Sequence, residues 1–559
     1  MKRLMLFYFI LIAIISFFGV KALFHPGFYT SHDGEHQVLR LYHFDKAIKD
    51  GQIPPRWADY QILNGHGYPL FIFSYHAPWI MAEPLRLVGL SLTTTVKLMF
   101  ILTFFLSGLF MLLWLKELFG EFPAFLGSVL YLWAPYRFSN IFVRASLGEA
   151  AAFMFAPLIF YSIEKLNQKE DFRGILIGGI GLCGLILSHV MTSLVFIFPV
   201  VIYLLTNLLL SKKRLLYFKK AILLFLLGLS LSAYYTLPAF FERKYTKFSK
   251  FFPLNLFTHH FVTLRQLIYS RWGYGFSFPG VEKDGMAFQI GAAQWLSLFL
   301  TLVLLGWVFL SRKKLKILEK EKVLKAIGFI FSFLFSLMMM VKFSHPIWVL
   351  VTRFIPFDFP WRFLGLSIFS LSFLSAFTTL LLEELGDKRI TFLISLFLIL
   401  LTFYGNRNHL RVNKYIYYDD SHYEKITNST TSFNEFLPSW AKKKYYDQKR
   451  DLVEIVKGQA SVRKIERKSD KISFKVENKE KKTVLRITTL FFPGWKLFVN
   501  GRRGEFDFEN SGMIEFKPLL GRSNVLLIFT KTPIRVIGEI ISFSTLIFLV
   551  LWILRFRWR

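Results

Sequence analysis

Long apolar runs recur along this chain, and they constrain its fold more than any other feature. Such runs extend from residue 4 to 23, from 97 to 113 and from 221 to 241, among others. A helix needs about 20 predominantly apolar residues to cross a bilayer, and a soluble domain does not repeat runs of this length. The composition agrees, because 54% of the 559 residues are hydrophobic. We therefore predict a polytopic α-helical membrane protein.

We predict twelve transmembrane helices and orient them by the charges of their connections. The expected spans are residues 4–24, 94–116, 122–138, 149–165, 174–190, 192–210, 220–241, 288–310, 326–343, 361–382, 390–405 and 534–554. Prolines interrupt the apolar residues 69–91, where we expect interfacial or re-entrant helices instead of a span. Basic connections such as 211–220 and 311–325 then share one side, which the positive-inside rule assigns to the cytoplasm. Both termini of this multi-pass protein are predicted to lie on the cytoplasmic side of the cell membrane.

The N-terminus and the net charge agree with this class. Lys2 and Arg3 precede the first apolar run, and no small-residue cleavage site precedes Phe24, so we expect a retained signal anchor. The net charge is +32, but the cations fall mainly between apolar runs, which favours the bilayer as partner and argues against nucleic acid. The single cysteine, Cys183, excludes an intrachain disulfide.

The chain is predicted to have three parts. Residues 1–405 form a multi-span domain with outer loops at 25–93 and 242–288, residues 406–533 form an extracytoplasmic domain, and residues 534–559 form a last helix with a basic tail. From about residue 455 apolar and polar residues alternate with a period of two, as in 472–476, 484–487 and 496–499. Asn500-Gly501 predicts a hairpin turn, and the whole pattern predicts a small antiparallel β-sandwich.

The first predicted outer loop carries two carboxylates directly after the first span, in Ser31-His32-Asp33-Gly34-Glu35. A carboxylate beside the membrane can act as a general base towards an acceptor hydroxyl or bind a divalent cation. Asp33 also precedes an amphipathic run, where an acidic residue is a common helix cap. Both interpretations of Asp33 stay open.

Charged residues gather at the next predicted outer turn. Arg137 ends one span, and Arg144 and Glu149 precede and open the next. Glu149 at a helix N-terminus is favoured by the helix dipole, which is the structural interpretation. The functional alternative combines Glu149 with Asp33, with Arg137 and Arg144 binding phosphate.

Three further side chains are candidate substrate ligands. His189 lies at an outer helix turn, where a lone histidine is usually structural. Arg353 and Arg362 flank an aromatic segment at the outer end of a span, where arginine either snorkels to the interface or binds a lipid phosphate. No nucleotide-binding loop, CxxC or HExxH motif is present.

Several stretches together resemble one bacterial family. They are Ser31-His32-Asp33, Gly51 to Trp57, Asn64 to Leu70, Ala134 to Arg137, Arg144 to Glu149, Ser188-His189, Phe359 to Arg362 and Phe492 to Lys496. In this order they resemble membrane proteins named 6-pyruvoyl-tetrahydropterin synthase-related, which are similar to YfhO-like proteins. Both resemble the C-type (GT-C) glycosyltransferase superfamily. The family name implies no pterin chemistry.

The resemblance implies a GT-C-like fold and transfer of a sugar from a polyprenyl-phosphate carrier to an envelope lipid, glycan or protein. It implies an acidic base or metal ligand in the first outer loop, which corresponds to Asp33, and a second acid, which corresponds to Glu149. Both are candidate ligands of a divalent Mg or Mn ion. The chain departs from the family in having Asp33-Gly34-Glu35 in place of Asp-X-Asp.

We therefore expect a glycosyltransferase with Asp33, Glu35 and Glu149 as catalytic candidates. Arg137, Arg144, His189, Arg353 and Arg362 are the candidates for binding substrate or lipid phosphate. A transporter or flippase for a lipid-linked glycan is the alternative, and it predicts charges buried in mid-span. A non-catalytic scaffold for envelope assembly is a third interpretation. The ionisable residues of the predicted spans lie near span ends, which favours surface chemistry.

Overall fold

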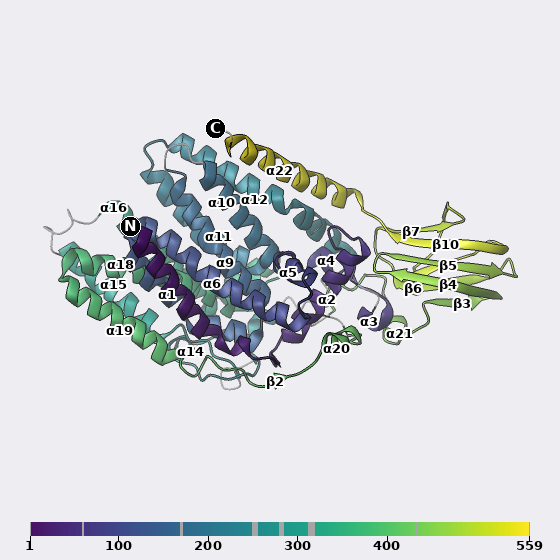
Figure 1. Cartoon of the computed structure of the whole chain (residues 1–559), viewed down its shortest axis with the longest axis horizontal. Coiled ribbons are helices and arrows are strands. Elements are labelled where there is room, and N and C mark those ends of the chain that lie inside the picture. The colour runs from purple at the N-terminus through teal and green to yellow at the C-terminus, as the bar shows by residue number, and fades with distance from the viewer. Residues whose placement is uncertain are drawn as a thin grey trace. The chain divides into compact units, whose positions relative to one another are not determined.

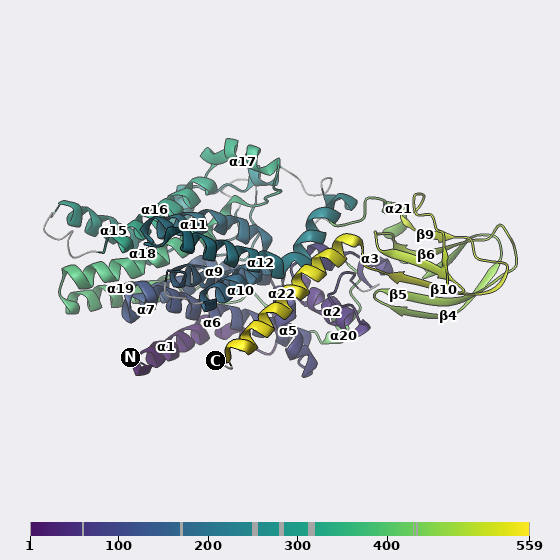
Figure 2. The same ribbon diagram turned by 90° about the horizontal axis from the view of Figure 1, so that it is seen from above.

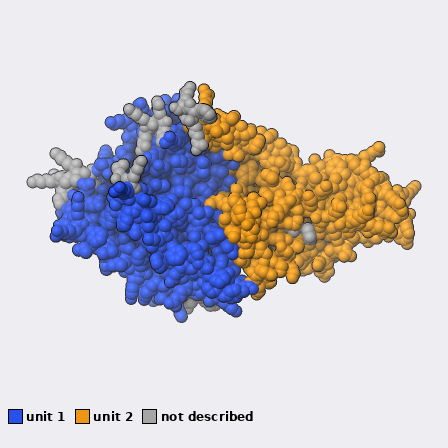
Figure 3. All heavy atoms as spheres, viewed as in Figure 1, with its two compact units in different colours: residues 1–35, 94–231, 254–417 blue, residues 36–93, 232–253, 418–559 orange. Residues whose placement is uncertain are grey.

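A computed structural model describes residues 2–58, 61–167, 172–248, 255–278, 284–310, 319–428, 430–431 and 434–557. The chain forms two compact units, shown in Figure 3. Unit 1 comprises residues 1–35, 94–231 and 254–417, and unit 2 comprises residues 36–93, 232–253 and 418–559. The predicted multi-span domain, residues 1–405, therefore contains residues of both units, since the segments 36–93 and 232–253 belong to unit 2.

Unit 1 is almost entirely helical (Figure 1). Its long helices are α1 (Lys2–Val20), α6 (Leu92–Phe119), α7 (Glu121–Leu132), α9 (Leu147–Lys165), α10 (Phe172–Ser188), α11 (Val190–Leu210), α15 (Ala292–Leu310), α16 (Lys320–Met340), α18 (Leu364–Leu385) and α19 (Lys388–Asn406). Short elements connect them: η1 (Lys21–Phe24), β1 (Phe28–Tyr29), α8 (Pro135–Phe138), η2 (Ser139–Arg144), η4 (Leu256–His259), α14 (Leu264–Ile268), η6 (Lys342–Ser344), α17 (His345–Thr352), η7 (Pro360–Phe363) and β2 (Tyr415–Ile416). Three helices contain residues of both units: α2 (Gly34–Asp50), α12 (Arg214–Glu242) and α6, whose first two residues belong to unit 2.

Ten helices within the described part of the chain are long and apolar enough to cross a membrane. Two shorter apolar helices, α7 and α10, coincide with the two remaining predicted spans. The prediction of a polytopic helical membrane protein is confirmed. The count of twelve spans stays a prediction, because 12 residues of α7 give a length of only about 18 Å.

Helix α18 forms the centre of unit 1, with packing contacts to α7, α15, α16 and α19. Its residues 364–381 are all buried, although they include many serines and threonines. Small hydroxyl side chains allow close helix packing and return their hydrogen bonds to the helix itself, as Ser372 does to the carbonyl of Ile368 at 2.7 Å. Between helices, Ser367 contacts Ser336 of α16 at 2.7 Å, and Thr378 contacts Thr301 of α15 at 2.5 Å.

Helices α1 and α19 both pack against the residues around Trp133, directly after α7. The Trp133 indole N–H donates to the carbonyl of Ile15 in α1 at 3.1 Å. From α19, the ring centroid of Phe403 lies 4.4 Å from that of Trp133, and the Asn406 amide donates to the Trp133 carbonyl at 2.7 Å. Contacts with Trp133 thus hold both α1 and α19 against the end of α7.

Unit 2 combines short helices with two β-sheets. Its helical elements are α3 (Ile62–Gly65), α4 (Leu70–Phe73), α5 (Ala77–Leu87), η3 (Arg243–Tyr245), α20 (Asp420–Glu424), α21 (Lys443–Tyr446) and α22 (Pro533–Arg557). Its strands are β3 (Val453–Lys457), β4 (Ala460–Lys468), β5 (Lys471–Asn478), β6 (Val484–Leu490), β7 (Trp495–Val499), β8 (Arg502–Gly504), β9 (Met513–Phe516) and β10 (Gly521–Phe529). No helix within the described residues 69–91 qualifies as a span, since α5 has 11 residues and would be about 16 Å long.

The strands form antiparallel sheets of order β4-β5-β10-β7-β8 and β3-β6-β9, which appear as separate layers in Figure 2. The predicted hairpin is confirmed: Val499 pairs with Arg502 across a two-residue turn. Asn500 and Gly501 have φ of 50° and 78°, as a type I′ turn requires. Phe474 and Phe516 bring the two sheets into contact, with ring centroids 6.4 Å apart.

Three of the stretches that carry the family resemblance pack together inside unit 2. The Trp57 ring lies edge-on to Trp495 at 5.3 Å. Gly67 has φ of +73°, and a Cβ atom there would lie 2.3 Å from the Trp57 indole nitrogen. The carbonyl of His66 accepts from the amide of Leu490 at 3.0 Å. These stretches therefore have a packing role in unit 2.

Candidate functional site

The candidate site of unit 1 is built on an irregular turn between α8 and α9. Residues Ser139–Arg144 form the π-helical turn η2, and Ala145 then adopts a left-handed conformation with φ of 51°. Helix α9 begins two residues later at Leu147. A π-helical turn changes the direction of side chains relative to a regular helix and is frequent at functional sites. Here it places Arg144 and Glu149 against each other.

Glu149 accepts three hydrogen bonds although it is only 1% exposed. Its Oε1 atom accepts from the Tyr136 hydroxyl at 2.6 Å. Its Oε2 atom accepts from Arg144 Nη1 at 2.6 Å and from Arg362 Nη1 at 3.2 Å. A buried carboxylate is tolerated when it is paired and hydrogen-bonded in this way, and its place in the first turn of α9 is also favoured by the helix dipole.

Asp358 continues this arrangement on the other side of Arg362. It accepts from Arg362 Nε at 2.7 Å and Nη2 at 2.6 Å, which is the bidentate geometry preferred by arginine and carboxylate. The Trp361 ring lies between the cations, with its centroid 4.6 Å from the Arg144 guanidinium carbon and 5.7 Å from that of Arg362. Two guanidinium groups and two carboxylates thus alternate.

The charges of this cluster shift the pKa values of its members. Burial alone would lower the pKa of Arg144, but the Glu149 carboxylate outweighs it, so this pKa lies above its ordinary value. Burial likewise opposes ionisation of Asp358, but the charge and hydrogen bonds of Arg362 lower the pKa of that carboxyl. Both side chains are therefore charged at neutral pH.

The Nε and Nη2 atoms of Arg144 make no hydrogen bond to any residue that the structure describes, so they remain available to an anion.

The segment carrying Asp33 is bound to the same turn through its backbone. The amide of His32 donates to the carbonyl of Val143 at 2.9 Å, and the amide of Asp33 donates to that of Arg144 at 2.9 Å. Asp33 directly precedes α2, where a cap was one interpretation, but its half-buried carboxylate has no hydrogen bond to the described residues. The structure therefore leaves this carboxylate available for chemistry, next to a residue that also binds Glu149.

His32 is held by a different segment. Its Nε2 atom lies 3.2 Å from the carbonyl oxygen of Tyr274, and its ring stacks on Phe276 with centroids 4.2 Å apart. Burial and the nearby positive charge of Arg144 lower its pKa, so the imidazole is neutral at neutral pH. The side chain of His32 thus fixes the loop at Asp33 without adding charge.

His189 caps helix α11 beside the charged cluster. Its Nδ1 atom accepts from the amide of Thr192 at 3.2 Å, which assigns the proton of the neutral ring to Nε2. Burial and the positive charge of Arg362 lower the pKa of His189 to about 3. The structure thus gives His189 a role as a helix cap, which the sequence did not indicate, and the charges of Glu149, Asp358 and Arg362 act on its ring.

Three predicted site residues lie apart from the cluster. Glu35 is exposed in the first turn of α2, and Arg353 is exposed directly after α17. Arg137 is 1% exposed, donates to Ser107 Oγ at 2.6 Å and has the rings of Phe104, Tyr131 and Phe153 around its guanidinium. The structure brings Asp33, Arg144, Glu149, His189 and Arg362 together, but not these three.

Sequence reasoning missed Tyr136 and Asp358 as members of the site. Tyr136 adjoins the predicted Arg137, and Asp358 lies four residues before the predicted Arg362. An acid and an arginine at this spacing face each other on a helix, but here the pair spans an irregular turn and the start of η7. The i,i+4 spacing of opposite charges was the signal available in the sequence.

The donor set does not fit a divalent cation at Glu149. Both carboxylate oxygens are already hydrogen-bonded, and two of the three donors are guanidinium groups. A cation there would meet two fixed positive charges. No group of three or more histidine, cysteine, aspartate or glutamate side chains suited to a metal occurs among the described residues.

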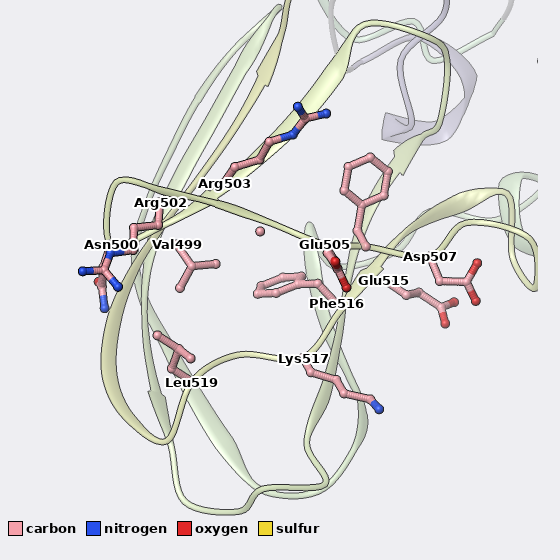
Figure 4. A pocket seen from close by; sticks show the side chains of 12 residues that line it. Val499, Asn500, Arg502, Arg503, Glu505, Asp507, Glu515, Phe516, Lys517 and Leu519 are labelled. Atoms are coloured by element: carbon pink, nitrogen blue, oxygen red, sulfur yellow. The ribbon is translucent and has the colours of Figure 1, made fainter.

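Unit 2 contains a separate hollow in its β-region, of about 900 Å³ (Figure 4). It is lined by the end of β7 and its hairpin turn, by residues of β8 and β9 and by the segments that follow these two strands, and it contains none of the predicted site residues. Three cations (Arg502, Arg503, Lys517) and three acids (Glu505, Asp507, Glu515) line it together with Phe506 and Phe516. Its charges are balanced, which suits a polar ligand better than a phosphate.

Comparison with known proteins gives distant likenesses. No protein-family model matches the chain. An uncharacterised protein of Lactococcus lactis subsp. cremoris (strain MG1363) is 26% identical over 207 residues, which are 35% of this chain and 33% of that protein. The cryo-EM structure of the arabinofuranosyltransferase AftD from Mycobacteria is 11% identical, with a TM-score of 0.47 over 73% of this chain and 27% of AftD. A mutant form of AftD gives 12% identity and a TM-score of 0.44, with 73% and 28% covered. The chain thus spans about a third or less of each of these proteins.

Proposed function

We propose that this chain is an integral membrane glycosyltransferase of GT-C type. It would move a sugar from a polyprenyl-phosphate carrier to an envelope lipid, glycan or protein on the extracytoplasmic side. The observation that carries the proposal is the backbone hydrogen bond at η2 from the amide of Asp33 to the carbonyl of Arg144. It places an available carboxylate next along the site to an arginine that retains unused donors. A general base and a phosphate-binding cation are what transfer from a phosphate carrier requires.

The proposed step is a displacement with inversion at the anomeric carbon. The acceptor hydroxyl oxygen forms the new bond to that carbon while Asp33 takes the hydroxyl proton. The bond from carbon to phosphate oxygen breaks, and its electron pair stays on the lipid phosphate. Arg144, with Arg362 nearby, stabilises the charge that develops there. A phosphate leaving group needs no strong general acid, so one base and these cations suffice.

Glu149 and Asp358 have a positioning role in this proposal. Together they bind Arg144 and Arg362 at distances of 2.6–3.2 Å, which fixes both guanidinium groups before substrate arrives. Preorganised charges cost no reorganisation during the reaction. Because the site residues do not fit a metal at Glu149, no step uses one. Arg137 takes no part, since its guanidinium is enclosed by aromatic rings.

The alternatives are a transporter or flippase for a lipid-linked glycan and a non-catalytic envelope scaffold. The hollow of the β-region favours the scaffold as the second candidate, because its balanced charges and aromatic residues suit a glycan. Neither alternative needs the Asp33 carboxylate to exchange a proton, and this difference separates the hypotheses.

The decisive experiment replaces Asp33 in cells. The gene is deleted and restored as wild type, Asp33→Asn or Glu35→Gln at equal protein levels, and envelope glycans are compared by mass spectrometry. Glu35→Gln is the matched control, since this carboxylate is exposed two residues away. We expect Asp33→Asn to reduce the transferred sugar by at least about a hundredfold, the usual contribution of a general base, and Glu35→Gln to restore it.

Full restoration by Asp33→Asn would show that Asp33 is structural and would favour the flippase or scaffold. Equal loss with Asp33→Asn and Glu35→Gln would show that the site depends on charge in the loop as a whole, which also contradicts the proposed base. The proposal stands only when the two variants differ.

A further inference from the structure

An open groove of about 460 Å³ lies in unit 1 where α1 and α19 end. It is lined by Lys21, Ala22, His25, Leu410, Arg411, Val412 and Tyr415. None of these residues belongs to the candidate site. The segments from both helices are joined here, because the Tyr415 hydroxyl donates to the carbonyl of Ala22 at 2.8 Å and its ring stacks on His25 at 3.7 Å.

The two helices that lead to this groove present apolar side chains outwards. Only 22% of the span of α1 and 28% of that of α19 is buried. The exposed apolar residues are Leu4, Leu6, Phe7, Phe9, Ile10, Ile14, Phe17 and Phe18 of α1, and Ile390, Phe392, Leu393, Leu396, Phe397 and Leu400 of α19. In a membrane-spanning helix such a face contacts lipid tails. The groove therefore begins where the lipid-facing surfaces end.

The level of the groove is that of lipid headgroups. Phe24, Tyr404 and Tyr417 are 53%, 65% and 69% exposed at the ends of these segments. Exposed aromatic side chains of this kind, with cations next to them, mark the boundary between hydrocarbon and water. The Arg407 guanidinium lies over the ring of Tyr404, 3.9 Å from its centroid.

The charges at the groove are all positive. Lys21 and Arg411 are exposed, and neither is in an ion pair with another residue of the described part of the chain. No acidic residue lines the groove, and none occurs between Arg407 and Tyr418. Lysine and arginine beside a membrane surface attract anionic lipid headgroups.

We infer that this groove binds the headgroup of an anionic phospholipid. Lys21 and Arg411 contact the phosphate, the apolar walls formed by Ala22, Leu410 and Val412 take the upper part of the lipid, and its chains lie along α1 and α19. A free phosphate ion would use only the cations, so the apolar walls favour a lipid. The inference does not depend on the proposed transferase activity.

A bound lipid would stabilise the segment that leads to Asp33. The Tyr274 hydroxyl donates to the carbonyl of Arg411 at 2.8 Å, and the carbonyl of Tyr274 lies 3.2 Å from His32 Nε2. In addition, β1 pairs with β2, with Tyr29 opposite Tyr415. The groove is thus connected to the loop of Asp33 by both a side chain and a strand pair.

Lipid retention by the purified full-length protein tests the inference. Native mass spectrometry would compare phosphatidylglycerol with phosphatidylcholine of identical acyl chains, on wild type and on the double variant Lys21→Gln/Arg411→Gln. The charge-matched control is Arg265→Gln/Lys342→Gln, which removes two exposed cations of unit 1 elsewhere. A competition with a polyprenyl phosphate at equal concentration forms the third arm.

We expect wild type and control to bind more phosphatidylglycerol than phosphatidylcholine. The groove variant should bind at least about tenfold less phosphatidylglycerol than wild type, because each cation contributes to headgroup binding. Phosphatidylglycerol should also raise the melting temperature of wild type more than that of the groove variant. If the double variant does not fold, the two single substitutions, each expected to give a partial loss, take its place.

Undiminished retention by the groove variant would overturn the inference, as would equal retention of the two phospholipids by wild type. Displacement of phosphatidylglycerol by the polyprenyl phosphate would assign the groove to the sugar carrier instead. Each readout is binding, so a failed activity test of Asp33→Asn leaves this result unaffected.

Discussion

At the scale of single residues, the candidate site is decided by which charges are paired and which are not. Glu149, Asp358 and Arg362 are held in short ion pairs, while Asp33 and two nitrogen atoms of Arg144 have no partner among the residues described. Paired buried charges are stable and fixed, and unpaired ones are available to a ligand. We therefore assign the role of base to the unpaired Asp33 and the role of positioning residues to the paired Glu149 and Asp358.

Glu149→Gln should destabilise the protein strongly. The substitution leaves the guanidinium groups of Arg144 and Arg362 without one carboxylate in a buried place, and loss of one partner from a buried pair costs about 3–5 kcal/mol. The apparent melting temperature in detergent should fall by several degrees. Glu35→Gln, at an exposed position, should leave it unchanged. An unaltered melting temperature for Glu149→Gln would show that the two arginines do not need this charge.

At the scale of elements, irregular backbone positions the chemistry. The π-helical turn η2 and the left-handed Ala145 bring Arg144 next to the first turn of α9, and the same turn accepts the amides of His32 and Asp33. Between α10 and α11, the side chain of His189 caps the start of α11. A cap that is itself titratable makes this element sensitive to pH.

Stability should fall as the pH falls below the ordinary histidine pKa of about 6.5. The pKa of His189 is lowered to about 3 in the folded protein, so between these values the unfolded chain binds a proton that the folded chain does not. Protonation would also place a hydrogen on Nδ1, the atom that accepts from Thr192. The loss should reach about 1–2 kcal/mol at pH 5.

The variant His189→Asn isolates this effect, because asparagine is an effective N-cap without a titrating group. Melting temperatures of both proteins would be measured from pH 7 to pH 5, and the decline should be steeper for wild type. Parallel curves for the two proteins would contradict the assignment of this pH dependence to His189.

At the scale of the whole molecule, the topology is a prediction that rests on charge. The exposed cations at residues 212–214 and the exposed Glu35 should lie on opposite sides of the membrane if the positive-inside rule holds for this chain. The single natural cysteine makes this testable, since a Cys183→Ala background carries no other thiol.

In that background, Glu35→Cys should react with a membrane-impermeant thiol reagent in intact cells. Lys212→Cys and Arg389→Cys, at exposed positions of predicted cytoplasmic connections, should react only after the membrane is permeabilised. Reaction of all three in intact cells, or of Lys212→Cys alone, would contradict the predicted orientation and with it the extracytoplasmic position of Asp33.

The sequence by itself determined the membrane class, most span positions, the strands of the β-region and the Asn500-Gly501 turn. These follow from local patterns, because an apolar run, an alternation of period two or a turn pair acts within a few residues. The pairing of charges was decided by the tertiary structure. Arg362 is 213 residues from Glu149, and Arg137 is enclosed by aromatic rings although Arg144, seven residues later, is not. Which cation meets which carboxylate depends on how distant helices pack and on the turn at η2, and no local pattern contains that information.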